Sequence, residues 1–200
     1  MLTHHALALL AASVYRGPWS GVADLDERYA LLPREGELVC AIAGTDPKNA
    51  LDLLRDGDAW PVWIPGLGMM HGGFGRGGAA LWRRIDPVMR RDGLITYCGH
   101  SLGGAIAENL ACHHARERPG QPFRVVSFGA PRIAWLNGRP HGLLQLGVEQ
   151  VGYRRGGDPI PTLPWLAWGF LHGAKGWDLL PDRPYNVADH AMALYAVDVA

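Results

Sequence analysis

A serine between two glycines is the residue of this chain whose setting most clearly predicts chemistry. Gly99-His100-Ser101-Leu102-Gly103 matches the pattern G-x-S-x-G, in which a serine occupies a sharp turn between a strand and a helix. Small neighbours allow that turn, and the turn holds the Ser101 hydroxyl clear of the main chain. Such a hydroxyl is a candidate nucleophile, and the adjoining helix N-terminus stabilises negative charge on an attacked oxygen.

A serine hydroxyl needs a base to take its proton and a carboxylate to orient that base. In the G-x-S-x-G architecture these partners follow the serine in the order acid, then histidine. Asp158 follows an apolar run, and His190 lies near the start of a helix-like C-terminal segment. The sequence therefore predicts a catalytic triad of Ser101, Asp158 and His190. His172 is the alternative base, and the alternative role of Asp158 is to form a turn with Pro159.

Strands and helices that would position these residues follow from the hydrophobic pattern. Apolar runs predict strands over residues 37–43, 94–98, 123–128 and, more weakly, 148–153, and helical spacing covers 79–91 and 102–116. This alternation predicts an α/β fold with a mostly parallel central sheet flanked by helices. Catalytic side chains of such sheets project beyond the carboxyl ends of the strands, where Ser101 and Asp158 both lie.

Composition limits the class of protein. The 200 residues fit one domain, and 19 basic side chains balance 19 acidic ones. We therefore expect no nucleic-acid partner. The long uncharged run 159–174 contains prolines and is shorter than the roughly 20 apolar residues of a transmembrane helix. The paired histidines lack metal-binding spacing, so neither a metal nor a cofactor is expected.

Cysteine usage and the first residues bear on the cellular compartment. Cys40, Cys98 and Cys112 are an odd number without C-x-x-C spacing, which favours free thiols over disulfides or a zinc site. Residues 1–15 place no Lys or Arg ahead of their apolar stretch, unlike a secretory signal peptide. Together these features favour, weakly, a cytoplasmic location.

Further segments resemble those of the class 3 (fungal-type) triacylglycerol lipases, a family of the α/β-hydrolase fold. The matching segments occur in the family's order, namely Gly44-Thr45, His71-Gly72-Gly73-Phe74, residues 99–105, 127–132 and 158–164, and Asp189-His190 with Tyr195. The resemblance implies a single α/β-hydrolase domain over residues 1–200. It also implies the same triad that the residue types predict.

The resemblance further implies the surroundings of the triad. Backbone N–H groups of Thr45 and Leu102 would form the oxyanion hole. Residues 46–70 would form a lid-like insertion, and its apolar residues would cover the pocket in water and turn outward on an apolar phase. From this stretch and the adjoining segment we expect four substrate-binding residues, which are Trp60, Trp63, Ile64 and His71. The alternative is that these residues belong to the core or to a dimer contact.

These features predict a serine carboxylester hydrolase of the lipase or esterase type, acting through an acyl-enzyme intermediate. Its substrate would be a small acyl ester or a lipid, with transient contact to a lipid interface and without a cofactor. Two alternatives share the pattern. An acyltransferase or thioesterase would use the same triad, and a non-catalytic binding or structural protein would retain the scaffold alone.

Overall fold

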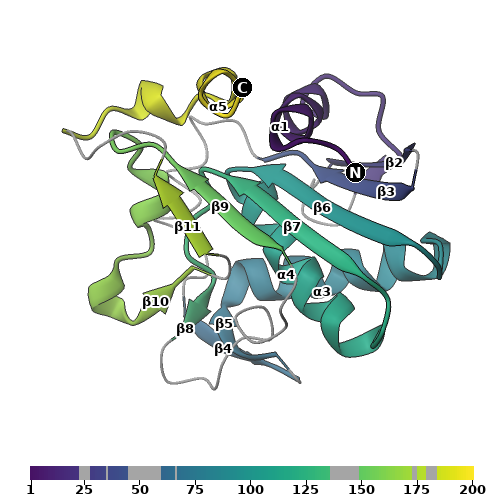
Figure 1. Ribbon diagram of the computed structural model, residues 1–200. Helices are drawn as coiled ribbons and strands as arrows, with labels where there is room; N and C mark the ends of the chain where they lie inside the picture. The colour runs from purple at the N-terminus through teal and green to yellow at the C-terminus, as the bar shows by residue number, and fades with distance from the viewer. Residues whose placement is uncertain are drawn as a thin grey trace.

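The computed structural model describes residues 1–22, 28–34, 36–44, 60–65, 67–135, 149–172, 175–178 and 184–200, and the side chains of Trp135 and of 175–178 are left aside. A seven-stranded sheet runs through the centre, in the order β1-β2-β3-β6-β7-β9-β11 (Figure 1). Its strands are β1 (Gly21–Val22), β2 (Arg28–Arg34), β3 (Glu37–Ile42), β6 (Leu94–His100), β7 (Phe123–Phe128), β9 (Gln150–Arg154) and β11 (Lys175–Asp178). From β3 to β11 all neighbours pair in parallel, whereas β1 and β2 are antiparallel. The predicted mostly parallel sheet is confirmed.

Helices cover both faces of this sheet. They are α1 (His4–Ser13), α3 (Gly72–Ile85), α4 (Leu102–Glu117) and α5 (Met192–Asp198), and Figure 1 shows α1 and α5 on one side and α3 and α4 on the other. The alternation of side chains along a strand explains this two-layered core. In β3, Val39 and Ala41 pack in the core under α1 and α5, while Cys40 and Ile42 pack in the core under α3 and α4.

A second, smaller sheet is antiparallel and has the order β10-β8-β5-β4. Its strands are β4 (Pro61–Ile64), β5 (Gly68–His71), β8 (Ala134–Trp135) and β10 (Phe170–Leu171). Part of the predicted lid therefore forms the β4–β5 hairpin of this sheet. Residues 46–59 and 66 of the predicted lid lie outside the described residues. The remaining short elements are the 3-10 helices η1 (Asp86–Val88), η3 (Ile160–Thr162), η4 (Leu166–Trp168) and η5 (Val187–His190).

Helix α3 ends earlier than the predicted helix over 79–91, because a 3-10 turn with Pro87 follows Ile85, and it also begins earlier. Glycines at 72, 73, 75, 77 and 78 weaken the helical signal there, because glycine has a low helix propensity. Packing against α4 overrides that propensity. A β-carbon on Gly78 would lie 2.1 Å from Asn109 Oδ1 of α4, so only glycine lets the two helices come so close.

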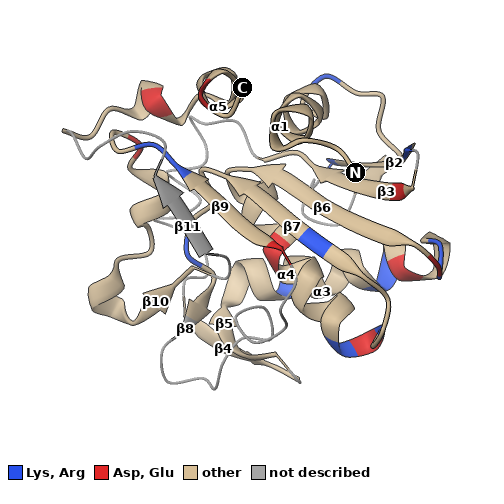
Figure 2. Cartoon of the chain, viewed as in Figure 1, with Lys and Arg blue, Asp and Glu red and all other residues tan. Residues whose placement is uncertain are grey.

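Charged residues gather mainly at the ends of the elements, with one basic position inside β7 (Figure 2). That residue, Arg124, is buried and donates to Thr96 Oγ1 at 2.9 Å, to Glu37 Oε2 at 3.0 Å and to the Leu2 carbonyl at 2.9 Å. Burial raises the pKa of Glu37, but hydrogen bonds from Thr96 and the Leu2 N–H and the charge of Arg124 outweigh it and lower that pKa. This network joins β3, β6 and β7 to the N-terminal segment.

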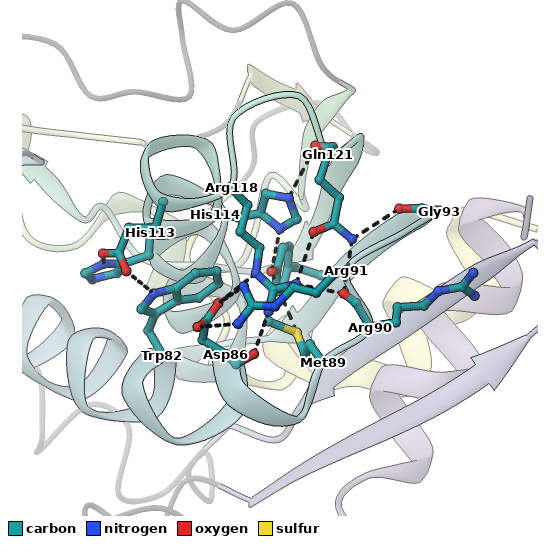
Figure 3. A network of polar contacts seen from close by, with 12 residues as sticks. Trp82, Asp86, Met89, Arg90, Arg91, Gly93, His113, His114, Arg118 and Gln121 are labelled. Carbon is teal, nitrogen blue, oxygen red and sulfur yellow. Dashed lines mark hydrogen bonds and ion pairs between the residues drawn. The ribbon is translucent and has the colours of Figure 1, made fainter.

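A second polar network closes the amino ends of β6 and β7 (Figure 3). Arg118, which follows α4, donates from Nε to Asp86 Oδ1 at 2.7 Å and from Nη1 to the Arg90 carbonyl at 2.8 Å. It also donates to Gln121 Oε1 at 3.1 Å. These contacts fix the turn after α3 to the turn after α4, at the opposite end of the strands from Ser101.

The cysteines and the helices of the described residues bear on the expected free thiols and on membrane spans. Cys40, Cys98 and Cys112 are all buried and free, as the sequence predicts. Burial raises the pKa of the Cys98 thiol to about 12, so that it stays protonated. None of the helices that the structure describes has the length and apolar character needed to cross a bilayer.

Candidate active site

Ser101 occupies a strained turn between β6 and α4. Its φ of 58° and ψ of −129° make it the one non-glycine residue with positive φ in the described part of the chain. A conformation of this kind costs about 1–3 kcal/mol and persists only where the surroundings enforce it. Here the Ser101 N–H donates to the Phe128 carbonyl at 2.9 Å, which ties the turn to β7. The predicted sharp turn is therefore present.

Glycines around Ser101 allow α4 to start directly on the strand ends. A β-carbon on Gly99 would lie 2.4 Å from the Gly103 carbonyl oxygen, and one on Gly103 would lie 2.3 Å from the Ile42 carbonyl oxygen. Both obstructing atoms belong to the backbone and cannot rotate away. The two glycines of the G-x-S-x-G pattern are thus required by close approach of main chain to main chain.

Three side chains from distant parts of the chain meet at this turn. His190 Nε2 lies 2.7 Å from Ser101 Oγ, and His190 Nδ1 lies 2.7 Å from Asp158 Oδ2. A carboxylate only accepts, so Nδ1 carries the proton and Nε2 is left to accept from the serine hydroxyl. All three residues are at most 2% exposed. The structure brings together the serine, acid and base predicted from the sequence.

Asp158 accepts further hydrogen bonds that hold it in place. The Tyr195 hydroxyl donates to Oδ2 at 2.6 Å, and the Ile160 N–H donates to Oδ1 at 2.8 Å. Burial, together with the negative charge of Asp158, raises the pKa of Tyr195, so this hydroxyl remains a donor. Gly129, at φ +60°, passes so close that a β-carbon there would lie 3.1 Å from Asp158 Oδ2. Tyr195 stands out in the sequence only through the family resemblance, and no local pattern predicts these three contacts of Asp158.

His100, next to the serine, has both ring nitrogens engaged by residues other than Ser101. It is 1% exposed, and its Nε2 lies 2.7 Å from the His190 carbonyl oxygen while its Nδ1 lies 2.8 Å from the Tyr15 hydroxyl. Burial and the neighbouring His190 lower the pKa of His100 well below its ordinary value. It is a neutral, packed side chain that contacts the backbone of His190.

Of the two predicted oxyanion-hole residues, Leu102 lies within the described residues. Leu102 begins α4, so its N–H has no acceptor within the helix and lies directly after Ser101. Thr45, the other predicted donor, lies outside the described residues. Its neighbour Gly44 packs against the serine, because a β-carbon on Gly44 would lie 3.1 Å from Ser101 Cβ.

The other predicted residues lie in different settings. Trp60 and Trp63 are 81% and 64% exposed, whereas Ile64 and His71 are buried. The ring of His71 stacks on Phe74 at 4.0 Å, and neither of its nitrogens has a hydrogen-bond partner among the described residues. Burial lowers the pKa of His71 to about 4.

Among the described hydrogen bonds, none joins His172, the alternative base, to Ser101. Burial, followed by the charges of Arg154 and Arg132, lowers the pKa of His172 to about 4. The serine hydroxyl instead lies against His190. The described geometry therefore favours His190 as the base.

Comparison with known proteins identifies the family. A sequence model of the family described as lipase (class 3) matches residues 39–167. The chain belongs to the class 3 lipase family. This confirms the resemblance seen in the motifs, and lipases of this class are carboxylic ester hydrolases.

Two curated relatives match part of this lipase-family chain. The secreted mono- and diacylglycerol lipase 1 of Fusarium solani is 37% identical over 96 residues, which cover 46% of this chain and 27% of that protein. Lipase A of Sodiomyces alcalophilus is 34% identical over 109 residues, which cover 48% of this chain and 26% of that protein. The chain thus spans about a quarter of the length of these relatives.

A solved structure shows the same fold. The lipase from Rhizopus microsporus var. chinensis superimposes with a TM-score of 0.74 at 18% identity, covering 94% of this chain and 83% of that one. The predicted α/β-hydrolase fold is confirmed.

The predicted cytoplasmic location is wrong. The relative from Fusarium solani is a secreted lipase, which contradicts that prediction. The prediction relied on the pattern of residues 1–15 and on the three unpaired cysteines, and the structure shows why the cysteines misled. All three are buried in the core, where a thiol packs as a small apolar group and reports on packing rather than on the redox state of a compartment.

Proposed function

We propose that this chain cleaves carboxylic esters, with Ser101 as nucleophile, His190 as base and Asp158 as orienting acid. The observation that carries the proposal is the unbroken series of short hydrogen bonds from Asp158 Oδ2 through the His190 ring to Ser101 Oγ. Each bond runs in the direction that the reaction needs, because the tautomer fixed by Asp158 leaves Nε2 free to accept a proton.

The reaction follows from these positions. Ser101 Oγ attacks the ester carbonyl while its proton passes to His190 Nε2, and Asp158 stabilises the imidazolium that forms. The tetrahedral intermediate collapses as the C–O bond to the alcohol breaks, and the alkoxide takes the proton from His190. Water, deprotonated by the same nitrogen, then attacks the acyl-serine. As the C–O bond to Ser101 breaks, His190 returns the proton to Ser101 Oγ and the acid is released.

Negative charge on the carbonyl oxygen requires donors that are already in position. We assign this role to the N–H groups of Leu102 and Thr45. The position of Leu102 at the first turn of α4 supports its share, and the close packing of Gly44 on Ser101 supports that of the segment leading to Thr45. Loss of one such donor typically lowers turnover by about 10²–10³.

Exposed aromatic side chains support a lipid ester as substrate and transient contact with a lipid interface. Trp165 and Trp168 are 58% and 61% exposed, and their ring centroids are 5.9 Å apart. Trp165 precedes η4 and Trp168 is its last residue, soon after the loop that carries Asp158. Trp60 and Trp63 are also exposed, on and next to β4. Large apolar side chains left in water mark surfaces that bind apolar partners. The lid over 46–70 stays a prediction.

Covalent labelling tests the proposal directly. A fluorophosphonate is expected to label the wild-type protein at Ser101 and to leave the Ser101→Ala variant unlabelled. A folded wild-type protein that does not label would overturn the proposal and favour a non-catalytic protein that retains the scaffold. Product analysis with added alcohol or thiol acceptors separates hydrolysis from acyl transfer, since a transferase would form the new ester or thioester.

Hydrolysis of p-nitrophenyl esters of increasing acyl length, with and without micelles, tests the lipid interface. We expect micelles to raise the rate on long-chain esters in the wild type and to raise it less in a Trp165→Gln, Trp168→Gln variant. Val88→Gln is the matched control, because Val88 is 68% exposed but lies near the amino end of β6. Equal micelle effects in all three proteins would contradict interface contact through η4.

A further inference from the structure

His190 belongs to a short 3-10 helix, η5, rather than to a strand of the central sheet. Its ring is held by Asp158, but its main chain needs a separate support. That support is a side chain, since the His190 carbonyl oxygen lies 2.7 Å from His100 Nε2. His100 is the last residue of β6 and precedes Ser101. The nucleophile and the backbone of its base are therefore joined through one buried imidazole.

The hydrogen bonds of His100 assign its protonation. A carbonyl oxygen only accepts, so Nε2 must carry the proton. Burial lowers the pKa of His100, so the ring is neutral and Nδ1 has a lone pair. The Tyr15 hydroxyl, 2.8 Å from Nδ1, therefore donates. Tyr15 thus selects the one tautomer of His100 that can hold the His190 carbonyl.

A neutral His100 also suits the charge that develops beside it. The ring centroids of His100 and His190 are 4.5 Å apart. During the reaction His190 becomes an imidazolium, and a second cation at this distance would oppose its formation. By donating to Nδ1, the Tyr15 hydroxyl gives the neutral ring both of its hydrogen bonds.

Tyr15 itself is brought to this point by the N-terminal segment. It follows α1, which packs with α5 in the core cluster that contains Val14 and Tyr195. His5 Nδ1 lies 2.9 Å from the Ala196 carbonyl oxygen, so α1 also contacts the helix after His190. The hydroxyl of Tyr15 reaches the turn beside Ser101, because a β-carbon on Gly44 would lie 2.6 Å from it.

We propose that Tyr15 and His100 are positioning residues for the base: His100 holds the main chain of His190, and Tyr15 fixes the tautomer that does so. This inference rests on the proposed ester hydrolysis. It assigns to the N-terminal segment a share in catalysis that operates through the geometry of His190 and not through contact with the substrate.

Steady-state hydrolysis and the rate of fluorophosphonate labelling test the inference. Tyr15→Phe removes the donor and keeps the ring, and we expect kcat and the labelling rate to fall about threefold to tenfold, with KM changed less than about twofold. His100→Leu removes the donor to His190, and we expect a loss of about tenfold to a hundredfold. His100→Gln offers an amide N–H in place of Nε2–H and should recover most of that loss.

Tyr153→Phe is the matched control. The Tyr153 hydroxyl also bonds a histidine Nδ1, that of His4 at 2.7 Å, and also ties α1 to the sheet, but neither residue contacts His190. We expect Tyr153→Phe to lose about as much thermal stability as Tyr15→Phe does. We expect it to keep the kcat of the wild type.

Three results would count against the inference. A folded Tyr15→Phe variant with the wild-type kcat and labelling rate would overturn it. Equal losses of kcat in Tyr15→Phe and Tyr153→Phe would overturn it as well, since they would assign the effect to anchoring of α1. A folded wild-type protein that neither labels nor hydrolyses esters would overturn the proposed function and this inference with it, which distinguishes the two failures.

Discussion

Tyr195 and His190 donate to the same oxygen of one buried carboxylate. The Tyr195 hydroxyl lies 2.6 Å, and His190 Nδ1 2.7 Å, from Asp158 Oδ2. Hydrogen bonds to a charged group contribute about 1.5–3 kcal/mol each, more than those between neutral groups. Tyr195 therefore stabilises the ionised Asp158 and fixes the position of the oxygen that orients the base.

Replacement of Tyr195 by phenylalanine should weaken catalysis without opening a cavity. The ring remains in the core, but Asp158 Oδ2 loses a donor, and we expect kcat to fall about tenfold to a hundredfold. Tyr97→Phe is the matched control, because its buried hydroxyl bonds His114 on the α3 and α4 side of the sheet. Steady-state kinetics on both variants check this. An unchanged kcat in folded Tyr195→Phe would contradict a role for its hydroxyl.

The parts of this site that the sequence predicts are those encoded locally. Five consecutive residues, Gly99 to Gly103, predict the turn at Ser101. The order of the acid and the base along the chain then selects Asp158 and His190. The contacts of Tyr15 and His100 could not be predicted in this way. They depend on how α1 docks on the sheet, and no local pattern marks a tyrosine whose partner is distant in sequence.

The strands and helices also differ in how far local sequence predicts them. Strands buried on both faces, such as β3 and β7, appear as continuous apolar runs and were predicted at nearly their observed bounds. The sequence does not predict the start of α3, because its glycines lower the helix propensity and one of them, Gly78, serves the contact with Asn109. Whether 46–70 acts as a lid depends on motion and on residues outside the described ranges, so it stays a prediction.

Gly103→Ala is expected to disrupt the turn at Ser101. The new β-carbon would lie 2.3 Å from the Ile42 carbonyl oxygen, so α4 or β3 must shift. We expect a loss of about 3 kcal/mol or more in the free energy of unfolding, together with loss of fluorophosphonate labelling. Urea unfolding and a labelling assay measure the two effects.

The control for this variant is Gly36→Ala. Gly36 has a φ of +77° and no atom within 4 Å of a β-carbon, so an alanine there meets backbone strain alone. We expect it to cost about 1 kcal/mol and to leave labelling intact. If Gly103→Ala proved as mild as Gly36→Ala, close packing of α4 on β3 would not be the reason for the glycine.

His71 should make the protein less stable in acid. Its pKa is lowered to about 4 in the folded state, against an ordinary value of 6.5, because burial penalises the charged ring. Between these values the unfolded chain binds a proton that the folded chain does not, so stability falls as the pH decreases from 6.5 toward 4. From pH 7 to pH 5 this group alone should cost about 2 kcal/mol.

His71→Phe keeps the stack on Phe74 and removes two buried nitrogens that have no partner among the described residues. We expect the variant to be more stable than the wild type at pH 5 and to lose less stability between pH 7 and pH 5, by that same 2 kcal/mol or so. Urea unfolding at the two pH values measures both. His114 and His172, whose pKa values are also lowered to about 4, are present in both proteins and cancel in the comparison. An identical pH dependence would show that His71 is not held neutral.

Arg118 should support stability without affecting catalysis. Its side chain is 3% exposed and donates to Asp86, Arg90 and Gln121 at the amino ends of β6 and β7 (Figure 3). Replacing it by alanine removes a buried donor from all three, although Asp86 keeps Arg91 and the Arg90 carbonyl keeps Gln121 Nε2. Because Asp86 is 24% exposed, we expect a loss of about 2–3 kcal/mol in the free energy of unfolding. Arg91→Ala is the control, because Arg91 contacts the same Asp86 from a side chain that is 62% exposed, and exposed pairs contribute at most about 1 kcal/mol. Since Ser101 lies at the carboxyl end of β6, kcat of folded Arg118→Ala at a permissive temperature should equal that of the wild type. A lowered kcat would instead reveal coupling between the two ends of the strands, through α4 or through β6.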